Sequence, residues 1–176
     1  MNLESMAIEL PAFNGHPNRE PFRGVLTLVD TPSDKPPAGS RGHRVLLTRK
    51  AAEMALPSLL GMALDYSPSF DRHDARRKVG VITRAEITGK TIELGGYLFA
   101  KDFPEIVQQI EIGSIHASSG RRSRPPNPLG MSYEISDACV ADTRAKIWTL
   151  TRVTFTGAAI LRRDKAAYRT TWIELE

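Results

Sequence analysis

The stretch KVGVITRAEITGKTIELGGYLF, residues 78–99, decides the fold class of this chain. Two runs rich in β-branched residues flank Thr88-Gly89-Lys90, and a glycine between two such runs is typical of a β-hairpin turn. Similar strand-like runs lie on both sides of this hairpin, at 24–30, 44–48, 131–135 and 145–155. The sequence therefore predicts a sheet of many short strands.

Two segments carry a helical pattern instead. In 49–60 the apolar residues recur at helical spacing, and Pro57 is expected to kink or divide this helix. The second helix is expected over 102–112, with Asp102 as its N-cap and Glu105 in its first turn. Many strands and few helices predict a β-rich α+β domain, built as a small closed β-barrel surrounded by helices.

The length of 176 residues favours a single domain. Residues 1–23 contain Pro, Asn and Gly without a clean period, which predicts a flexible N-terminal segment. The folded domain is expected over 24–161, interrupted by a Pro- and Gly-rich segment at 31–42 that predicts a mobile surface loop. The charged tail 162–176 is expected to dock on this domain through apolar residues such as Trp172.

Composition excludes several classes of protein. With 41% hydrophobic and 25% charged residues, the chain is neither wholly disordered nor a collagen or coiled-coil rod. Its one cysteine, Cys139, excludes a disulfide scaffold and a cysteine-based zinc cluster. No run of 18 apolar residues and no signal peptide are present, so we expect a soluble cytoplasmic protein with no membrane partner.

The net charge of +4 is mild, but basic residues cluster at 72–78 and 121–124. Such clusters could contact nucleic-acid phosphates. They lack interleaved aromatic residues and a helix-turn-helix pattern, so solvated loops explain them better. A nucleic-acid-binding barrel stays open as a third hypothesis, resting on these clusters alone.

The histidines do not have the spacing of a metal site. They stand at 16, 43, 73 and 116, and none forms an HxxxH or HExxH pair. The short glycine elements are not followed by the lysine of a phosphate-binding loop. We therefore expect no metal and no cofactor.

Ser132 and His73 form a candidate nucleophile and base. Ser132 lies in LGMSYEI, where a loop becomes a strand, and Gly130 two places upstream lets backbone approach the hydroxyl. His73 lies at the edge of a loop that leads into the strand beginning near Val79. A histidine held near a serine can take its proton as general base.

Four pieces of the chain, in this order, resemble the prohead proteases of tailed bacteriophages, which are serine peptidases of capsid maturation related to herpesvirus assemblin. They are FDRHDARRKVGVI, GGYLFAKDFPEIVQQI, LGMSYEI and WTLTRVTFTGAAIL, and they fall within residues 24–161. In that family the serine opens a strand after a Gly-Leu or similar dipeptide, as Ser132 does after Gly130-Met131. The base lies in a loop ahead of a Gly-containing strand, as His73 does.

The resemblance implies a barrel wrapped by helices, with Ser132 as nucleophile and His73 as base. It further implies that the substrates are the scaffolding protein or a scaffolding segment of the major capsid protein. These would be cut in the host cytoplasm, inside the phage procapsid. Self-cleavage and, by analogy with the herpesviral branch, a homodimer follow from the same resemblance.

The third catalytic residue departs from the family. Many phage relatives carry a Glu in the late strand, and the alignment puts Arg152 in its place. An arginine cannot accept the imidazole N–H. If Arg162 and Arg163 are the pair that supports the oxyanion in herpesviral relatives, the third member falls at Thr154, whose hydroxyl can accept that N–H.

Other assignments remain open at this point. Asp137 and Asp142 lie near enough in the sequence to replace Thr154, and Arg162 and Arg163 are equally explained as surface charges. The missing carboxylate at Arg152 also motivates an alternative function, a catalytically inactive capsid-assembly or scaffolding component with the same fold.

Overall fold

The computed structural model describes residues 15–118 and 128–176, with only the backbone given for 114–118. Eight strands, two α-helices and one short 3-10 helix make up this part of the chain, so the β-rich α+β class is confirmed. In chain order the elements are β1 (Glu20–Leu28), β2 (Arg44–Leu47), α1 (Arg49–Ala55), η1 (Leu56–Leu59), β3 (Ala63–Tyr66), β4 (Lys78–Thr88), β5 (Thr91–Leu98), α2 (Pro104–Ser118), β6 (Leu129–Val140), β7 (Ile147–Arg162) and β8 (Trp172–Leu175).

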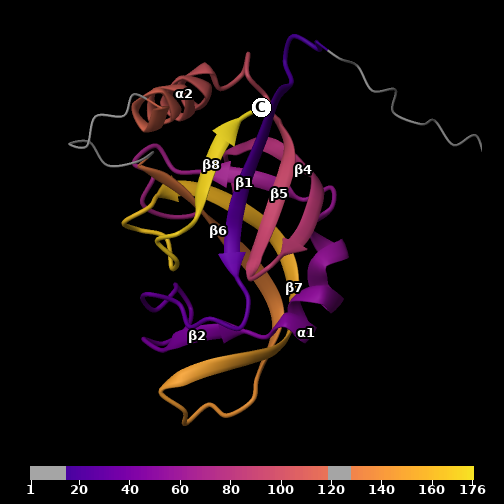
Figure 1. The fold of residues 1–176 in the computed structure, drawn as a ribbon, viewed down its shortest axis with the longest axis vertical. Helices are drawn as coiled ribbons and strands as arrows, with labels where there is room; N and C mark the ends of the chain where they lie inside the picture. Colours follow the sequence, from indigo (N-terminus) through magenta and orange to yellow (C-terminus); the bar gives the residue numbers. More distant parts are fainter. Residues whose placement is uncertain (1–14, 119–127) are drawn as a thin grey trace, which may run out of the picture.

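All eight strands belong to one strongly curled sheet (Figure 1). Its main order is β2-β7-β3-β4-β5-β1-β8, and β6 pairs with β7 in addition. The long β7 makes this possible, because β2 and β3 lie parallel to its two halves while β6 runs antiparallel to it. The result is a curled half-barrel around the main hydrophobic core, and the closed barrel surrounded by helices that the sequence predicts is not confirmed.

The predicted hairpin is confirmed, with β4 and β5 paired antiparallel from Gly80 opposite Leu98 to Thr88 opposite Thr91. Gly89 has a φ of 57°, in the left-handed region that favours glycine in a tight turn. The helix predicted over 49–60 is divided as expected: α1 ends at Ala55, and the 3-10 helix that follows carries Pro57.

Three boundaries differ from the sequence prediction. Helix α2 begins at Pro104 and runs to Ser118, so Asp102 is not its N-cap but accepts a hydrogen bond from the Asn18 amide (2.9 Å). Strand β1 begins at Glu20 and so includes the last four residues of the segment predicted to be flexible. Phe22 explains the difference, since its side chain is fully buried in the core.

The first and the last strand of the described residues pair with each other. Strand β8 pairs antiparallel with β1, with Phe22 opposite Leu175 and Val25 opposite Trp172.

The segment 31–42 was predicted to be mobile, but it is anchored. Ser33 exchanges hydrogen bonds with Val45 (2.7 and 3.0 Å), and the backbone N–H of Asp34 donates to Ala167 (2.8 Å). Among the described residues, no helix has the length and apolar character needed to cross a bilayer.

Close backbone approach at Gly24 permits the curl of the sheet. A Cβ at this position would lie 2.4 Å from the carbonyl oxygen of Trp172 and 2.8 Å from Sδ of Met131. Strands β1, β8 and β6 therefore meet where only glycine fits.

Replacing Gly24 by alanine is accordingly expected to destabilise the fold by about 1–3 kcal/mol, the usual cost of overpacking. The free energy of unfolding in urea, compared with that of an exposed control such as Ser136→Ala, measures this cost. Equal stability of the two variants would contradict the tight contact.

Candidate functional site

Hydrogen bonds fix the loop that carries His73, which joins β3 to β4. The hydroxyls of Ser67 and Ser69 donate to Oδ1 of Asp71 (2.9 and 2.6 Å), and these bonds lower the pKa of Asp71. On the other side of His73, the backbone N–H of Asp74 donates to Oδ1 of Asp65 (3.1 Å). His73 is thus held from both sides and is preorganised on a loop of defined conformation.

Strand β6 carries the other side chains of the site. Ser132 lies opposite Ala159 and Glu134 opposite Gly157 in the ladder with β7. Because side chains alternate along a strand, these two residues share one face. Their Cα atoms are about 6.6 Å apart, at a rise of about 3.3 Å per residue. Gly157 leaves room for the acid: a Cβ there would lie 2.8 Å from Oε2 of Glu134.

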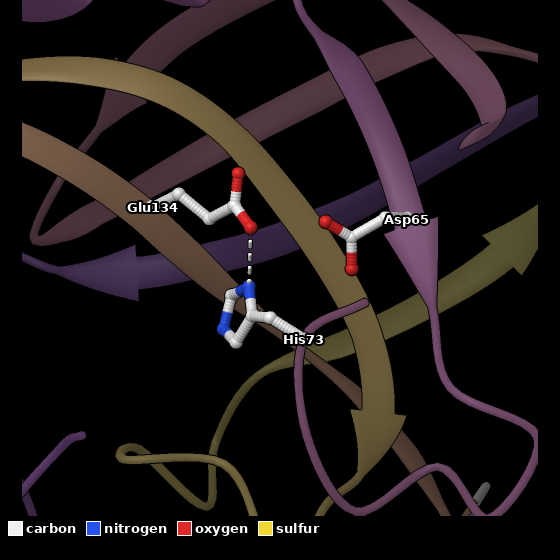
Figure 2. Close-up of side chains that lie close together, drawn as sticks. All are labelled: Asp65, His73 and Glu134. Atoms are coloured by element: carbon white, nitrogen blue, oxygen red, sulfur yellow. Dashed lines mark hydrogen bonds and ion pairs between the residues drawn. The ribbon is translucent and has the colours of Figure 1, made fainter. Parts of the chain in front are cut away.

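The imidazole of His73 binds Glu134, with Nδ1 3.2 Å from Oε1 of the carboxylate (Figure 2). Since the carboxylate can only accept, Nδ1 donates and Nε2 is left as the acceptor of the neutral ring. Within the described residues no hydrogen bond joins His73 to the Ser132 hydroxyl. Such bonds are often long before substrate binds.

His73, Ser132 and Glu134 line one cavity of about 590 Å³. Its other walls come from the loop at 37–40, from β2 and from the β6–β7 pair. The volume lies within the range of ligand and active-site pockets. The structure therefore brings together the predicted nucleophile and the predicted base, and adds a carboxylate to them.

Asp65 on β3 lies close to His73 and Glu134 and is fully buried. Figure 2 shows its carboxyl group beside Glu134 and His73. Burial raises the pKa of Asp65; the Asp74 N–H opposes this shift, and the nearby Glu134 carboxylate adds to it. Oδ2 of Asp65 has no hydrogen-bond partner among the described residues, and the Lys78 ammonium lies 3.6 Å from it.

Asp65, His73 and Glu134 could together hold a divalent cation. Each offers one ligand atom, and these atoms lie within 4.8 Å of one another. One imidazole nitrogen and two carboxylate oxygens are ligands that zinc and similar ions accept. The histidine spacing gave no sign of this cluster, because its members come from three separate segments. A proton and the Lys78 ammonium can balance the same carboxylates.

The structure does not bring Thr154 to His73. Thr154 lies opposite Ser136 on β6, and the acceptor at Nδ1 of His73 is Glu134. Arg152, which the predicted resemblance aligns with the glutamate of prohead proteases, is exposed and lies opposite Cys139. The site thus has a carboxylate, contributed by β6 in place of β7.

The two aspartates considered as alternatives are exposed and bonded locally. Asp137 accepts from the Ser136 hydroxyl (3.2 Å), and Asp142 binds the backbone and guanidinium of Arg144 (2.9 and 3.3 Å). Neither lines the cavity of the described residues.

Arg162 and Arg163 have different environments. The exposed guanidinium of Arg162 binds Asp164 through two hydrogen bonds of 2.9 Å. Arg163 is half-buried, which lowers its pKa, and its Nε has no partner among the described residues. Both arginines flank the serine motif through their backbones, since Arg162 pairs with Leu129 and the Cα of Arg163 would lie 3.5 Å from a Cβ at Gly130. Neither lines the cavity of the described residues.

Nearby carboxylates balance part of the first basic cluster. Lys78 faces Asp65 (3.6 Å), and Arg77 lies 3.7 Å from Asp74 and over the ring of Tyr66. The second cluster, at 121–124, lies outside the described residues.

Sequence reasoning missed Glu134 and Asp65. Glu134 could have been found, because a residue two places after Ser132 in a predicted strand must share its face. Asp65 carried no such signal, since it lies in a short apolar run, ALDY, of a strand that was not predicted.

Neither a scan against models of protein families nor a search of the curated proteins finds a match for this chain.

Proposed function

We propose that the chain is a serine endopeptidase in which Ser132 is the nucleophile, His73 the general base and Glu134 the third member of the triad. The observation that carries the proposal is the 3.2 Å contact from Nδ1 of His73 to Glu134 in a cavity that Ser132 also lines. This contact sets the tautomer that a general base needs, with Nε2 free to accept a proton.

The spacing of the residues supports the same roles. Ser132 and Glu134 share one strand face, with Cα atoms about 6.6 Å apart, and His73, which binds Glu134, lines the same cavity as Ser132. In the reaction, Oγ of Ser132 attacks the peptide carbonyl while Nε2 of His73 takes its proton. His73 then gives this proton to the leaving amine, and Glu134 stabilises the imidazolium in between.

The oxyanion needs donors close to Ser132. The backbone N–H of Met131 already donates to the Thr171 hydroxyl (3.1 Å). Of the two arginines, Arg162 is bound to Asp164, whereas Nε of Arg163 has no hydrogen-bond partner among the described residues. We assign oxyanion support to Arg163.

The resemblance to prohead proteases supplies the substrates of this proposal. They are the scaffolding protein and the major capsid protein, cut within the procapsid in the host cytoplasm, by an enzyme that is a homodimer as in the herpesviral branch. The same resemblance implies a closed barrel, whereas the strand order of the described residues ends at β2 and β8 in a curled half-barrel.

Labelling with a fluorophosphonate tests the enzyme class directly. Oγ of Ser132 is expected to displace fluoride from phosphorus, giving one added mass that peptide mapping places on Ser132. Ser132→Ala and His73→Ala should not be labelled, whereas Ser136→Ala, on the same strand and exposed, should be labelled as the wild type is. Folded wild-type protein that takes no label would overturn the proposal.

Co-expression tests the substrates. Wild type and Ser132→Ala are each co-expressed with the scaffolding and capsid proteins proposed as substrates, and intact masses are measured. Fragments that require Ser132 support the maturation role and give the cleavage sites. Intact partners in both samples favour the alternative, an inactive assembly component.

Chelation is expected to leave the reaction unchanged. The roles assigned here need no cation at Asp65, His73 and Glu134, and a cation there would compete for Nδ1 of His73. The rate of phosphonate labelling after EDTA treatment should therefore equal that of untreated protein. Loss of labelling on chelation and recovery with zinc would show that the cluster is a metal centre.

A further inference from the structure

The cavity that Ser132 lines also has a set of apolar walls. Besides His73 and Glu134, no charged side chain lines it among the described residues. Its surface is formed largely by five apolar side chains from β2, β6 and β7, namely Val45, Ile135, Val140, Trp148 and Leu150.

These walls are built and held in place. Val45 and Leu150 are buried in the sheet, where β2 pairs with β7. The indole N–H of Trp148 donates to the carbonyl of Thr143 (3.1 Å), and its ring stacks on His43 with centroids 4.5 Å apart. The opposite wall is the loop at 37–40, which the Ser40 hydroxyl closes by donating to the carbonyl of Pro37 (2.8 Å).

We propose that this cavity is a specificity pocket for a large apolar side chain, of the leucine, methionine or phenylalanine type, on the acyl side of the bond that Ser132 attacks. The inference rests on the proposed peptidase function. An apolar side chain gains by leaving water against these walls. A charged one would lose its hydration without a partner, because the Glu134 carboxylate is already engaged by His73.

Cleavage of a peptide library varied at one position measures the preference. We expect leucine, methionine or phenylalanine before the cut to be favoured about 100-fold over aspartate or lysine, the discrimination that differences in apolar burial supply. A library cut without preference, or cut after lysine or arginine by pairing with Glu134, would overturn the pocket while leaving the peptidase in place.

Val140→Asp tests the pocket from the protein side. Val140 is half-buried and lines the cavity, so a carboxylate there should remove most of the apolar preference without touching the triad. Val107→Asp on α2 is the matched control, because Val107 is also half-buried but lies outside the cavity. A preference that survives Val140→Asp in folded protein would contradict the inference.

Peptide binding to an inactive variant tests the pocket independently of catalysis. Peptides that end in leucine or in aspartate are titrated into Ser132→Ala, with Trp172→Phe added so that Trp148 is the only tryptophan. A Trp148 fluorescence change with the leucine peptide alone supports the pocket, even if the wild type proves unable to cleave. No response to either peptide would overturn the pocket, whatever the wild type does in the cleavage assay.

Discussion

Replacing His73 by alanine is expected to lower kcat about 10⁶-fold, and replacing Glu134 by glutamine about 10⁴-fold, as for the corresponding residues of other triads. The first change removes the only group assigned to accept the Ser132 proton. The second keeps the size of the side chain but offers an amide that can bind His73 in the wrong tautomer and cannot stabilise an imidazolium. KM should change little in either variant.

The matched control is Glu93→Gln on β5, a half-buried glutamate whose carboxylate accepts from the Thr91 hydroxyl (3.2 Å). Its turnover should equal that of the wild type. A second comparison, Arg152→Gln, addresses the position that the resemblance aligns with the glutamate of prohead proteases. If turnover survives in Glu134→Gln but is lost in Arg152→Gln, the assignment of the third residue to β6 is wrong.

The sequence made much of the sheet predictable. Gly89 between two β-branched runs marked the β4–β5 hairpin, and Pro57 marked the end of α1, because both residues restrict the backbone locally. Strand β3 was not predicted, because its four residues are too few to show a periodic pattern. Its position is set by pairing with β4 and β7, which no local pattern reports.

The site divides in the same way. Ser132 and His73 were predicted from their place at loop-to-strand junctions, and they do line one cavity. The third member was predicted in the late strand, at Thr154, because the prohead proteases that the sequence resembles carry theirs in that strand. The strand period pointed instead to Glu134, which shares a face with Ser132. The place of Asp65 in the site depends wholly on tertiary structure, since Asp65 comes close to His73 and Glu134 only through the curl of the sheet.

Asp65 is expected to act as a positioning residue, and its two simplest replacements should behave differently. In Asp65→Ala the backbone N–H of the half-buried Asp74 loses its acceptor, which costs about 1 kcal/mol of stability, the low end of the cost for a fully buried donor. The loop that carries His73 is then free to shift, and a misplacement near 1 Å costs about 100-fold in rate. Asp65→Asn keeps an oxygen for Asp74 and should retain most of the turnover.

The pH dependence of stability distinguishes the two charge states of Asp65. The folded state raises the pKa of this carboxyl above its ordinary value of 3.8, mainly by burial. The folded protein therefore holds the proton more tightly than the unfolded chain does. This contribution is fully present below pH 3.8 and is lost as the pH rises through the raised pKa.

The asparagine variant has no proton to lose at this position. Its free energy of unfolding relative to the wild type should therefore increase as the pH rises from below 3.8 towards neutrality. Urea unfolding of both proteins across this range measures the difference. A constant difference would mean that Asp65 ionises as freely in the fold as in water, with the Lys78 ammonium 3.6 Å away balancing its charge.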